Sequence, residues 1–178
     1  MKIVAFGASY SKESINKCFA AYAARQFNNT EIEILDLNNY ELPIFTVDAE
    51  SETGIPKNVK SFLDKLESAD LLVISMAEHN GSYTAAFKNL FDWTSRLKAK
   101  MFEGKKILLL SASPGKRGGA GVLEAARNRF PKHGAEIIGA FSLPSFKVNF
   151  NIESGIKDQE LENQFKGIVS SVQRIFTK

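Results

Sequence analysis

Hydrophobic and polar positions along the chain follow two alternating patterns, short β-rich runs and longer segments with a helical repeat. Four of the five β-rich runs are almost continuously apolar, which is typical of parallel strands covered by helices on both faces. The predicted strands are 2–7, 31–37, 70–76, 105–113 and 136–143. The predicted helices are 14–27, 56–67, 84–98, 118–132 and 157–176.

Strands that alternate with helices predict βαβ units and therefore a parallel sheet. Right-handed crossovers leave 2-1-3-4-5 as the commonest order for five strands, so we expect an α/β fold of the flavodoxin-like, three-layer type. No linker, repeat or change of composition divides the chain, and we expect residues 1–178 to form one flavodoxin-like domain. In such a fold a ligand binds at the carboxyl ends of the strands, beside the first one.

Composition narrows the classes of partner. The 178 residues are 44% hydrophobic, enough for a sizeable core, and the 23 basic and 20 acidic side chains are spread along the chain with a net charge of +3. We therefore expect no nucleic-acid partner. No apolar run approaches the roughly 20 residues of a membrane span, so we expect no membrane partner and a cytoplasmic location. A single cysteine and two distant histidines, His79 and His133, predict no metal site.

The loop after the first predicted strand, residues 7–16, leads directly into a helix. Free N–H groups and the dipole at a helix N-terminus favour an anion, and the hydroxyls of Ser9, Ser11 and Ser14 add donors for a phosphate. Asn16 either fixes the loop or reaches the same anion. For Ser14 the alternative is capping of the helix. The loop lacks both G-x-G-x-x-G and Gly-Lys-Ser/Thr, which excludes a dinucleotide fingerprint and a nucleoside-triphosphate loop.

Two further loops follow the third and fourth predicted strands. The first of them contains the turn pair Asn80-Gly81, which exposes backbone N–H groups suited to the edge of a flat heteroaromatic ring. The second, residues 111–121, is rich in glycine, so its backbone can approach a ligand closely. Each loop alone is equally compatible with an ordinary βα turn. Together, three such loops at one sheet edge indicate a ligand site.

Four segments give the chain a resemblance to a known family over residues 2 to 150. They are Ser14-Ile15-Asn16, DLNNYELPIF, AEHNGSYTAAFKNLFDW and SPGKRGGAG. These segments resemble the NADPH-dependent FMN reductases, flavodoxin-like enzymes that include quinone, chromate and azo-dye reductases. The third segment is the most specific, because seven of its residues fall where the family pattern places them: Glu78, Asn80, Ser82, Lys88, Asn89, Asp92 and Trp93.

The resemblance implies a role for individual residues. Ser9, Ser14, Ile15 and Asn16 resemble the family's ligands of the FMN phosphate. The segment along the isoalloxazine ring is implied to be Glu78, His79, Asn80 and Gly81. The loop closing over the other side of the ring is implied to contain Ser113, Gly115 and Gly118.

The implied function is that of an FMN-dependent NAD(P)H oxidoreductase. Hydride would pass from NADPH or NADH through FMN to flavin, a quinone or a similar small-molecule acceptor in ping-pong order, and no side chain is required as nucleophile, acid or base. The rival is a flavodoxin-like electron carrier without enzymatic activity. Such carriers usually have a strongly acidic surface, so the slightly basic charge favours the enzyme.

Two expectations concern surfaces. Predicted helix 84–98 carries apolar residues over a wide arc, and this surplus, together with the family resemblance, predicts a homodimer or homotetramer. Lys116 and Arg117 are candidates for attracting the NADPH phosphates, with a merely solvated turn as the alternative.

Overall fold

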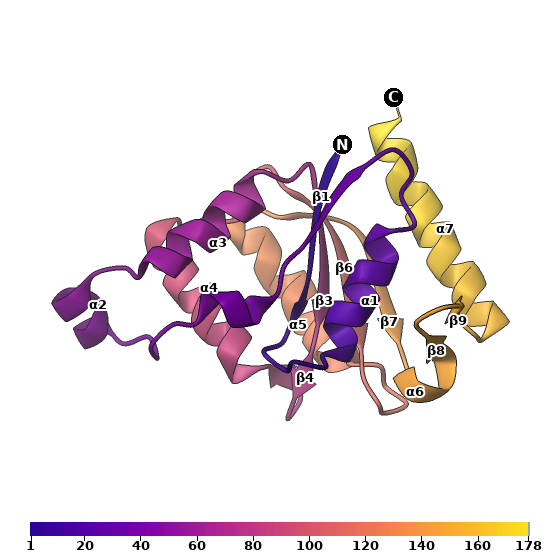
Figure 1. The fold of residues 1–178 in the computed structure, drawn as a ribbon, viewed down its shortest axis with the longest axis horizontal. Coiled ribbons are helices and arrows are strands. Elements are labelled where there is room, and N and C mark those ends of the chain that lie inside the picture. The colour runs from indigo at the N-terminus through magenta and orange to yellow at the C-terminus, as the bar shows by residue number, and fades with distance from the viewer. Residues whose placement is uncertain (178) are drawn as a thin grey trace.

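Five parallel strands form the central sheet of the computed structural model, which describes residues 1–177 (Figure 1). The order is β2-β1-β3-β6-β7, which confirms the predicted 2-1-3-4-5 order when only the strands of this sheet are counted. Their bounds are β1 (Lys2–Ala8), β2 (Glu31–Ile34), β3 (Leu71–Met76), β6 (Lys106–Ala112) and β7 (Glu136–Leu143). All six residues of β3 are buried, as expected for a strand covered on both faces.

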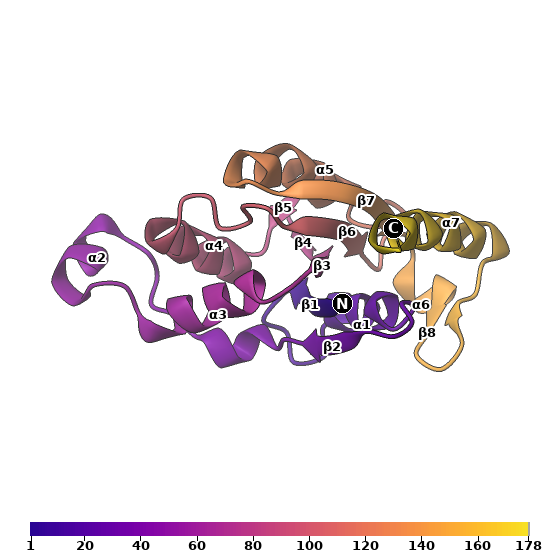
Figure 2. The same cartoon turned by 90° about the horizontal axis from the view of Figure 1, so that it is seen from above.

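Helices cover both faces of this sheet and complete the predicted three layers (Figure 2). One face is covered by α1 (Ile15–Ala24) and α7 (Gln159–Phe176), and the other by α3 (Lys57–Glu67), α4 (Ala85–Leu97) and α5 (Ala120–Arg129). Each face has its own hydrophobic core. Within residues 1–177, no helix has both the length and the apolar character needed to cross a membrane.

The close approach of α1 to β1 depends on Gly7. A Cβ at this position would lie 2.6 Å from the carbonyl carbon of Asn16 and 2.7 Å from Cα of Lys17. Real Cβ atoms do not tolerate such contacts with backbone, so α1 would have to move away from the sheet. Gly7 therefore fixes the start of α1 directly over the end of β1.

Several short elements were not predicted. They are η1 (Leu37–Tyr40), α2 (Val47–Thr53), α6 (Phe146–Asn149) and the hairpins β4 (Glu78–His79) with β5 (Ser82–Tyr83) and β8 (Phe150–Asn151) with β9 (Gly155–Ile156). The helix predicted over 118–132 is divided into α5 and the short η2 (Phe130–His133). The predicted strand 31–37 ends early, because the Asp36 side chain caps η1. Helix α2 has no buried residue and extends from one end of the molecule (Figures 1 and 2).

The prediction that helix 84–98 exposes surplus apolar side chains at the surface is wrong. Phe87, Leu90, Phe91 and Trp93 are all buried within the chain, and of the apolar residues used for that prediction only Leu97 is exposed, at 40%. The arc is wide because α4 contacts more than the sheet. Trp93 packs edge-on against Phe45, at 5.0 Å between ring centroids, and its indole N–H donates to the Pro43 carbonyl at 2.8 Å.

Candidate functional site

The three loops singled out from the sequence all emerge at the carboxyl edge of the sheet, the lower edge in Figure 1. They follow β1, β3 and β6, which are neighbours in the sheet. Two buried hydrogen bonds hold their bases together: Thr84 Oγ1 donates to the Ala8 carbonyl at 3.1 Å, and Asn16 Nδ2 donates to the Ala112 carbonyl at 3.0 Å. The fold therefore brings all the predicted site residues to one edge.

The loop after β1 offers hydrogen-bond donors for an anion. Ser9 Oγ accepts from the Ser11 N–H, and Ser14 Oγ accepts from the Lys17 N–H, each at 3.1 Å. Because both oxygens act as acceptors here, their hydroxyl protons are available to a ligand. Ile15 begins α1, whose first N–H groups have no partner within the helix and carry the positive end of its dipole. This donor set fits a phosphate.

The side chain of Asn16 points into the protein and forms hydrogen bonds there. It is only 3% exposed, and its amide oxygen accepts from Ser75 Oγ at 2.7 Å and from the Ala112 N–H at 2.9 Å. With the amide donation to Ala112, Asn16 connects α1 to both β3 and β6. These three hydrogen bonds fix the base of the loop to the sheet.

The loop after β3 is a tight hairpin. Asn80 and Gly81 form its turn with φ values of 51° and 77°, the pair of positive angles that a two-residue turn of this kind requires. His79, Asn80 and Gly81 are exposed at the edge. Their backbone groups are placed where a ring edge could be recognised.

Glu78 has a different partner from its neighbours in the hairpin. Its Oε1 accepts from the Val122 N–H at 2.9 Å, at the start of α5. Gly121 leaves the space for this contact, since a Cβ there would lie 2.5 Å from the same oxygen. A carboxylate at a helix N-terminus is stabilised by the helix dipole. Glu78 therefore fixes the hairpin against α5.

The loop after β6 packs on the loop that follows β7. The Phe146 N–H donates to the Ser113 carbonyl at 3.0 Å, and the Ser145 N–H donates to the Gly115 carbonyl at 2.9 Å. Gly118 has a φ of 60°, and a Cβ on it would lie 2.9 Å from the nitrogen of Pro144. The glycine is thus required for contact between the two loops, while Gly115 stays open toward solvent.

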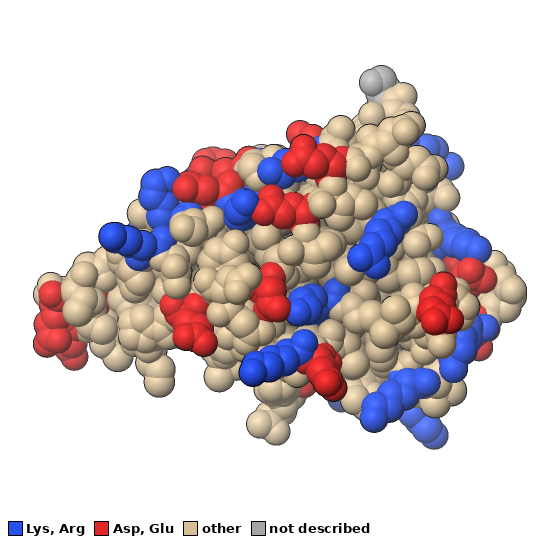
Figure 3. Space-filling view, viewed as in Figure 1, with Lys and Arg blue, Asp and Glu red and all other residues tan. Residues whose placement is uncertain are grey.

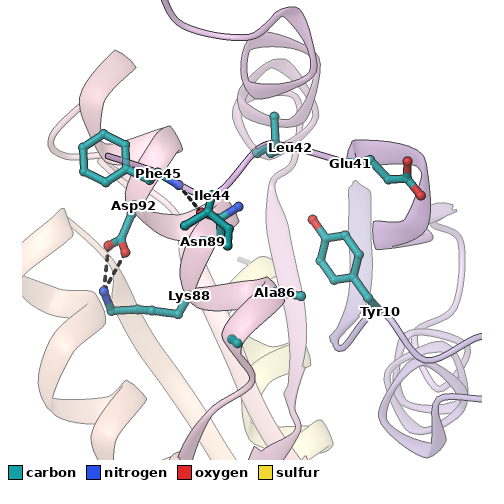
Figure 4. Close-up of a pocket in the computed structure, with 10 residues that line it drawn as sticks. Tyr10, Glu41, Leu42, Ile44, Phe45, Ala86, Lys88, Asn89 and Asp92 are labelled. Carbon is teal, nitrogen blue, oxygen red and sulfur yellow. Dashed lines mark hydrogen bonds and ion pairs between the residues drawn. The ribbon is translucent and has the colours of Figure 1, made fainter. Parts of the chain in front are cut away.

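A cavity of about 620 Å³, which the sequence did not indicate, lies beside the loop after β1 (Figure 4). Its lining residues are Tyr10, Glu41, Leu42, Ile44, Phe45, Ala85, Ala86, Lys88, Asn89 and Asp92. Tyr10 donates through its hydroxyl to the Tyr40 carbonyl at 3.0 Å, and burial raises its pKa to about 12. Two family segments supply its walls, DLNNYELPIF on one side and AEHNGSYTAAFKNLFDW on the other.

Asn89 explains part of the family motif on α4. Its side-chain amide donates to the Pro43 carbonyl at 2.9 Å and accepts from the Phe45 N–H at 2.7 Å. Figure 4 shows the contact with Phe45 across the cavity wall. Lys88 and Asp92, one turn apart, form an ion pair at 2.8 Å on the same helix. Of these three motif residues, Asn89 is therefore the one that holds the wall of the cavity.

The sequence of the chain is similar to those of known proteins. The model of the family described as NADPH-dependent FMN reductase matches residues 1–150. A quinone reductase of Escherichia coli is 35% identical over 80 residues, 45% of this chain and 43% of that protein. An NAD(P)H-dependent FMN reductase of Pseudomonas aeruginosa is 34% identical over 89 residues, 50% of this chain and 46% of that protein. The matches thus span less than half the length of these two relatives.

Solved structures support the fold. The flavoenzyme NAD(P)H:(acceptor) oxidoreductase FerB of Paracoccus denitrificans has a TM-score of 0.73 at 20% identity, with 97% of each chain covered. Oxidised flavodoxin 1 of Bacillus cereus has a TM-score of 0.56 at 16% identity and covers 97% of this chain and 98% of its own. The fold and the site define a flavodoxin-like α/β protein. The family model, which covers most of the chain, shows that it belongs to the NADPH-dependent FMN reductase family, as the sequence resemblance predicted.

Proposed function

We propose that this chain is an FMN-dependent NAD(P)H oxidoreductase that reduces flavin, a quinone or a similar small-molecule acceptor in ping-pong order. The observation that carries the proposal is the convergence of three loops on one sheet edge, with donors for a single phosphate at the start of α1. Family membership supports the cofactor and the electron donor.

The residues of the edge have distinct tasks in this proposal. Ser9, Ser11 and Ser14 donate hydroxyl hydrogen bonds to the phosphate, joined by the first N–H groups of α1. The backbone of 79–81 lies on one side of the flavin ring, and Ser113 with Gly115 on the other. Bound FMN supplies the hydride chemistry between nicotinamide and acceptor. The chain itself binds and orients, with Asn16, Glu78 and Gly118 holding the three loops in place.

A titration of the apoprotein with FMN and with FAD tests the proposed cofactor. We expect FMN to bind more tightly, because the first loop provides for one phosphate and carries no dinucleotide fingerprint. Ser14→Ala should weaken FMN binding by about 10- to 100-fold, the contribution of one hydrogen bond to a charged group. FAD binding as tight as FMN binding would contradict the assignment of the loop.

The electron-carrier alternative is separated by anaerobic addition of NADPH and NADH to the FMN-loaded protein. The proposed enzyme loses its flavin absorbance within seconds and regains it when a quinone is added. A carrier needs a second protein for its reduction, so its absorbance would stay unchanged.

The flavin titration also needs a control for Ser14→Ala. Ser68→Ala, at the exposed end of α3 away from the site, removes a hydroxyl group that is not expected to affect FMN binding.

A further inference from the structure

Three cationic side chains gather at one corner of the ligand edge. Lys116 and Arg117 form the tip of the loop after β6, and Lys147 lies on α6. The loop and α6 are adjacent, because the Ser145 and Phe146 N–H groups donate to carbonyls of the loop, and Figure 1 shows them side by side. Figure 3 shows Lys and Arg side chains at this corner. All three residues are exposed, and within residues 1–177 none of them forms an ion pair.

The backbone that presents these cations is firmly held. Ser142 Oγ donates to the Gly118 carbonyl at 3.0 Å, and Ser111 Oγ donates to the same carbonyl at 2.8 Å. Ser145 adopts a left-handed backbone with a φ of 47°, a conformation that is uncommon for serine and that places its N–H on the Gly115 carbonyl. The backbones of the loop after β6 and of α6, which carry these cationic side chains, are thus fixed before any ligand binds. This reduces the entropy lost on binding.

Nothing in the proposed phosphate site for FMN requires these cations. Hydroxyl groups and N–H groups at the start of α1 already supply donors there, and Lys116 and Arg117 belong to a different loop, the one after β6. Glu78, the carboxylate of the neighbouring hairpin, is engaged by the Val122 N–H. The corner therefore offers a second set of anion-attracting groups beside the proposed ring site.

We propose that this corner binds the 2′-phosphate of NADPH and makes the enzyme prefer NADPH to NADH. The inference rests on the proposed function. The two nucleotides differ only in that phosphate, which an Arg guanidinium can bind through two parallel hydrogen bonds and a Lys ammonium as a point charge. A dinucleotide whose nicotinamide end reaches the flavin beside Ser113 has its other end within reach of the adjoining corner.

Steady-state kinetics of the FMN-loaded double variant Lys116→Ala/Arg117→Ala give the first test. We expect kcat/KM for NADPH to fall by about 10- to 100-fold, the effect of losing charge-assisted hydrogen bonds, and kcat/KM for NADH to change by less than about twofold. The matched control is Lys100→Ala/Lys132→Ala, which removes the same charge from the exposed turn after α4 and from η2, at the opposite edge of the sheet. An equal loss for both nucleotides, or an equal effect of the control, would overturn the proposal.

Calorimetric binding of nucleotide fragments gives a second test that needs no turnover. We expect 2′,5′-ADP to bind the wild-type protein about tenfold more tightly than 5′-AMP, and expect this difference to disappear in the double variant and to remain in the control. Equal affinities for the two fragments in the wild type would refute the corner as a 2′-phosphate site. Failure of the proposed function has a different signature, namely no FMN binding and no oxidation of either nucleotide.

Discussion

Tyr83 follows the exposed turn of the β4–β5 hairpin but turns its ring into the core. The ring lies parallel to that of Phe130 at 6.5 Å, its hydroxyl is buried without a hydrogen-bond partner among residues 1–177, and burial raises its pKa to about 12. Tyr83 is therefore part of the core beneath α5.

We therefore expect Tyr83→Phe to leave stability unchanged or to raise the free energy of unfolding by up to about 1 kcal/mol, because a buried unpaired hydroxyl is removed. Urea unfolding measures this, and FMN affinity should stay the same. A loss of stability above about 1 kcal/mol would mean that the hydroxyl has a partner that the structure does not show.

Asp36 makes stability depend on acid pH. Its carboxylate accepts from Lys17 Nζ at 2.7 Å and from the Asn38 N–H and side-chain amide, and these contacts lower its pKa from 3.8 to about 2. A carboxyl group with a lowered pKa stabilises the folded chain above its unfolded pKa and loses this effect as the pH falls toward the folded one. The contribution should thus disappear between about pH 4 and pH 2.

We expect Asp36→Asn, which keeps an acceptor at the cap, to be less stable than the wild type at pH 6 and equal to it near pH 2. Urea unfolding at several pH values follows the difference, with the exposed Asp48→Asn on α2 as the control. A difference that stays constant over this range would contradict the role of the Lys17 contact.

At the scale of elements, α4 holds the segment between η1 and α2. We expect Asn89→Ala to cost about 1–2 kcal/mol of unfolding free energy, since two hydrogen bonds to backbone are lost, and to speed protease cleavage within 41–54. Lys88→Ala, which breaks only an exposed ion pair one residue away, should change stability by less than about 0.5 kcal/mol. Equal cleavage of both variants would show that Asn89 does not hold the wall.

Long elements were predictable from the sequence because their apolar patterns extend over many residues. The strand over 136–143 was predicted with the bounds that β7 has, and the helix over 157–176 differs from α7 by two residues at its start. The short α2 was missed because none of its residues is buried, so it has no apolar periodicity. The cavity wall at Pro43 was missed for another reason. It depends on hydrogen bonds from Asn89 and Trp93, which lie 46 and 50 residues further along the chain.

The site could be predicted as a set of loops but not as a set of contacts. The sequence indicated which residues reach the carboxyl edge, because parallel strands share that edge. It did not indicate that Asn16 is buried against Ala112, or that Glu78 binds the start of α5, since both contacts join segments far apart in the sequence. The binding roles of the loop residues stay predictions for the titrations above.

At the scale of the whole molecule, the predicted homo-oligomer needs a new surface, since α4 is buried. Exposed apolar side chains near the projecting end are Ile44 at 82%, Val47 at 72% and Leu97 at 40%. Exposed residues of this kind beside a cavity favour an interface with a second copy, and we propose a dimer through this end.

Light scattering at micromolar concentration should give a dimer mass for the FMN-loaded protein, and Ile44→Asp/Val47→Asp should give a monomer with an unchanged fold. Ile152→Asp, 78% exposed near the β8–β9 hairpin at the other end of the molecule, is the control and should remain dimeric (Figure 2). A monomer mass for the wild type would contradict this assembly.

The start of β1 and the end of α7 lie together at the edge opposite the site, where Met1, Phe176 and Thr177 line one hollow (Figure 1). The seven residues of β1, at about 3.3 Å each, separate that hollow from the ligand loops by roughly 20 Å. A protein attached to an electrode at this hollow would therefore present its loops to the electrolyte. Under the proposed function, nucleotide and acceptor would reach the loops from solution, while the attachment point itself would be a poor electrical contact.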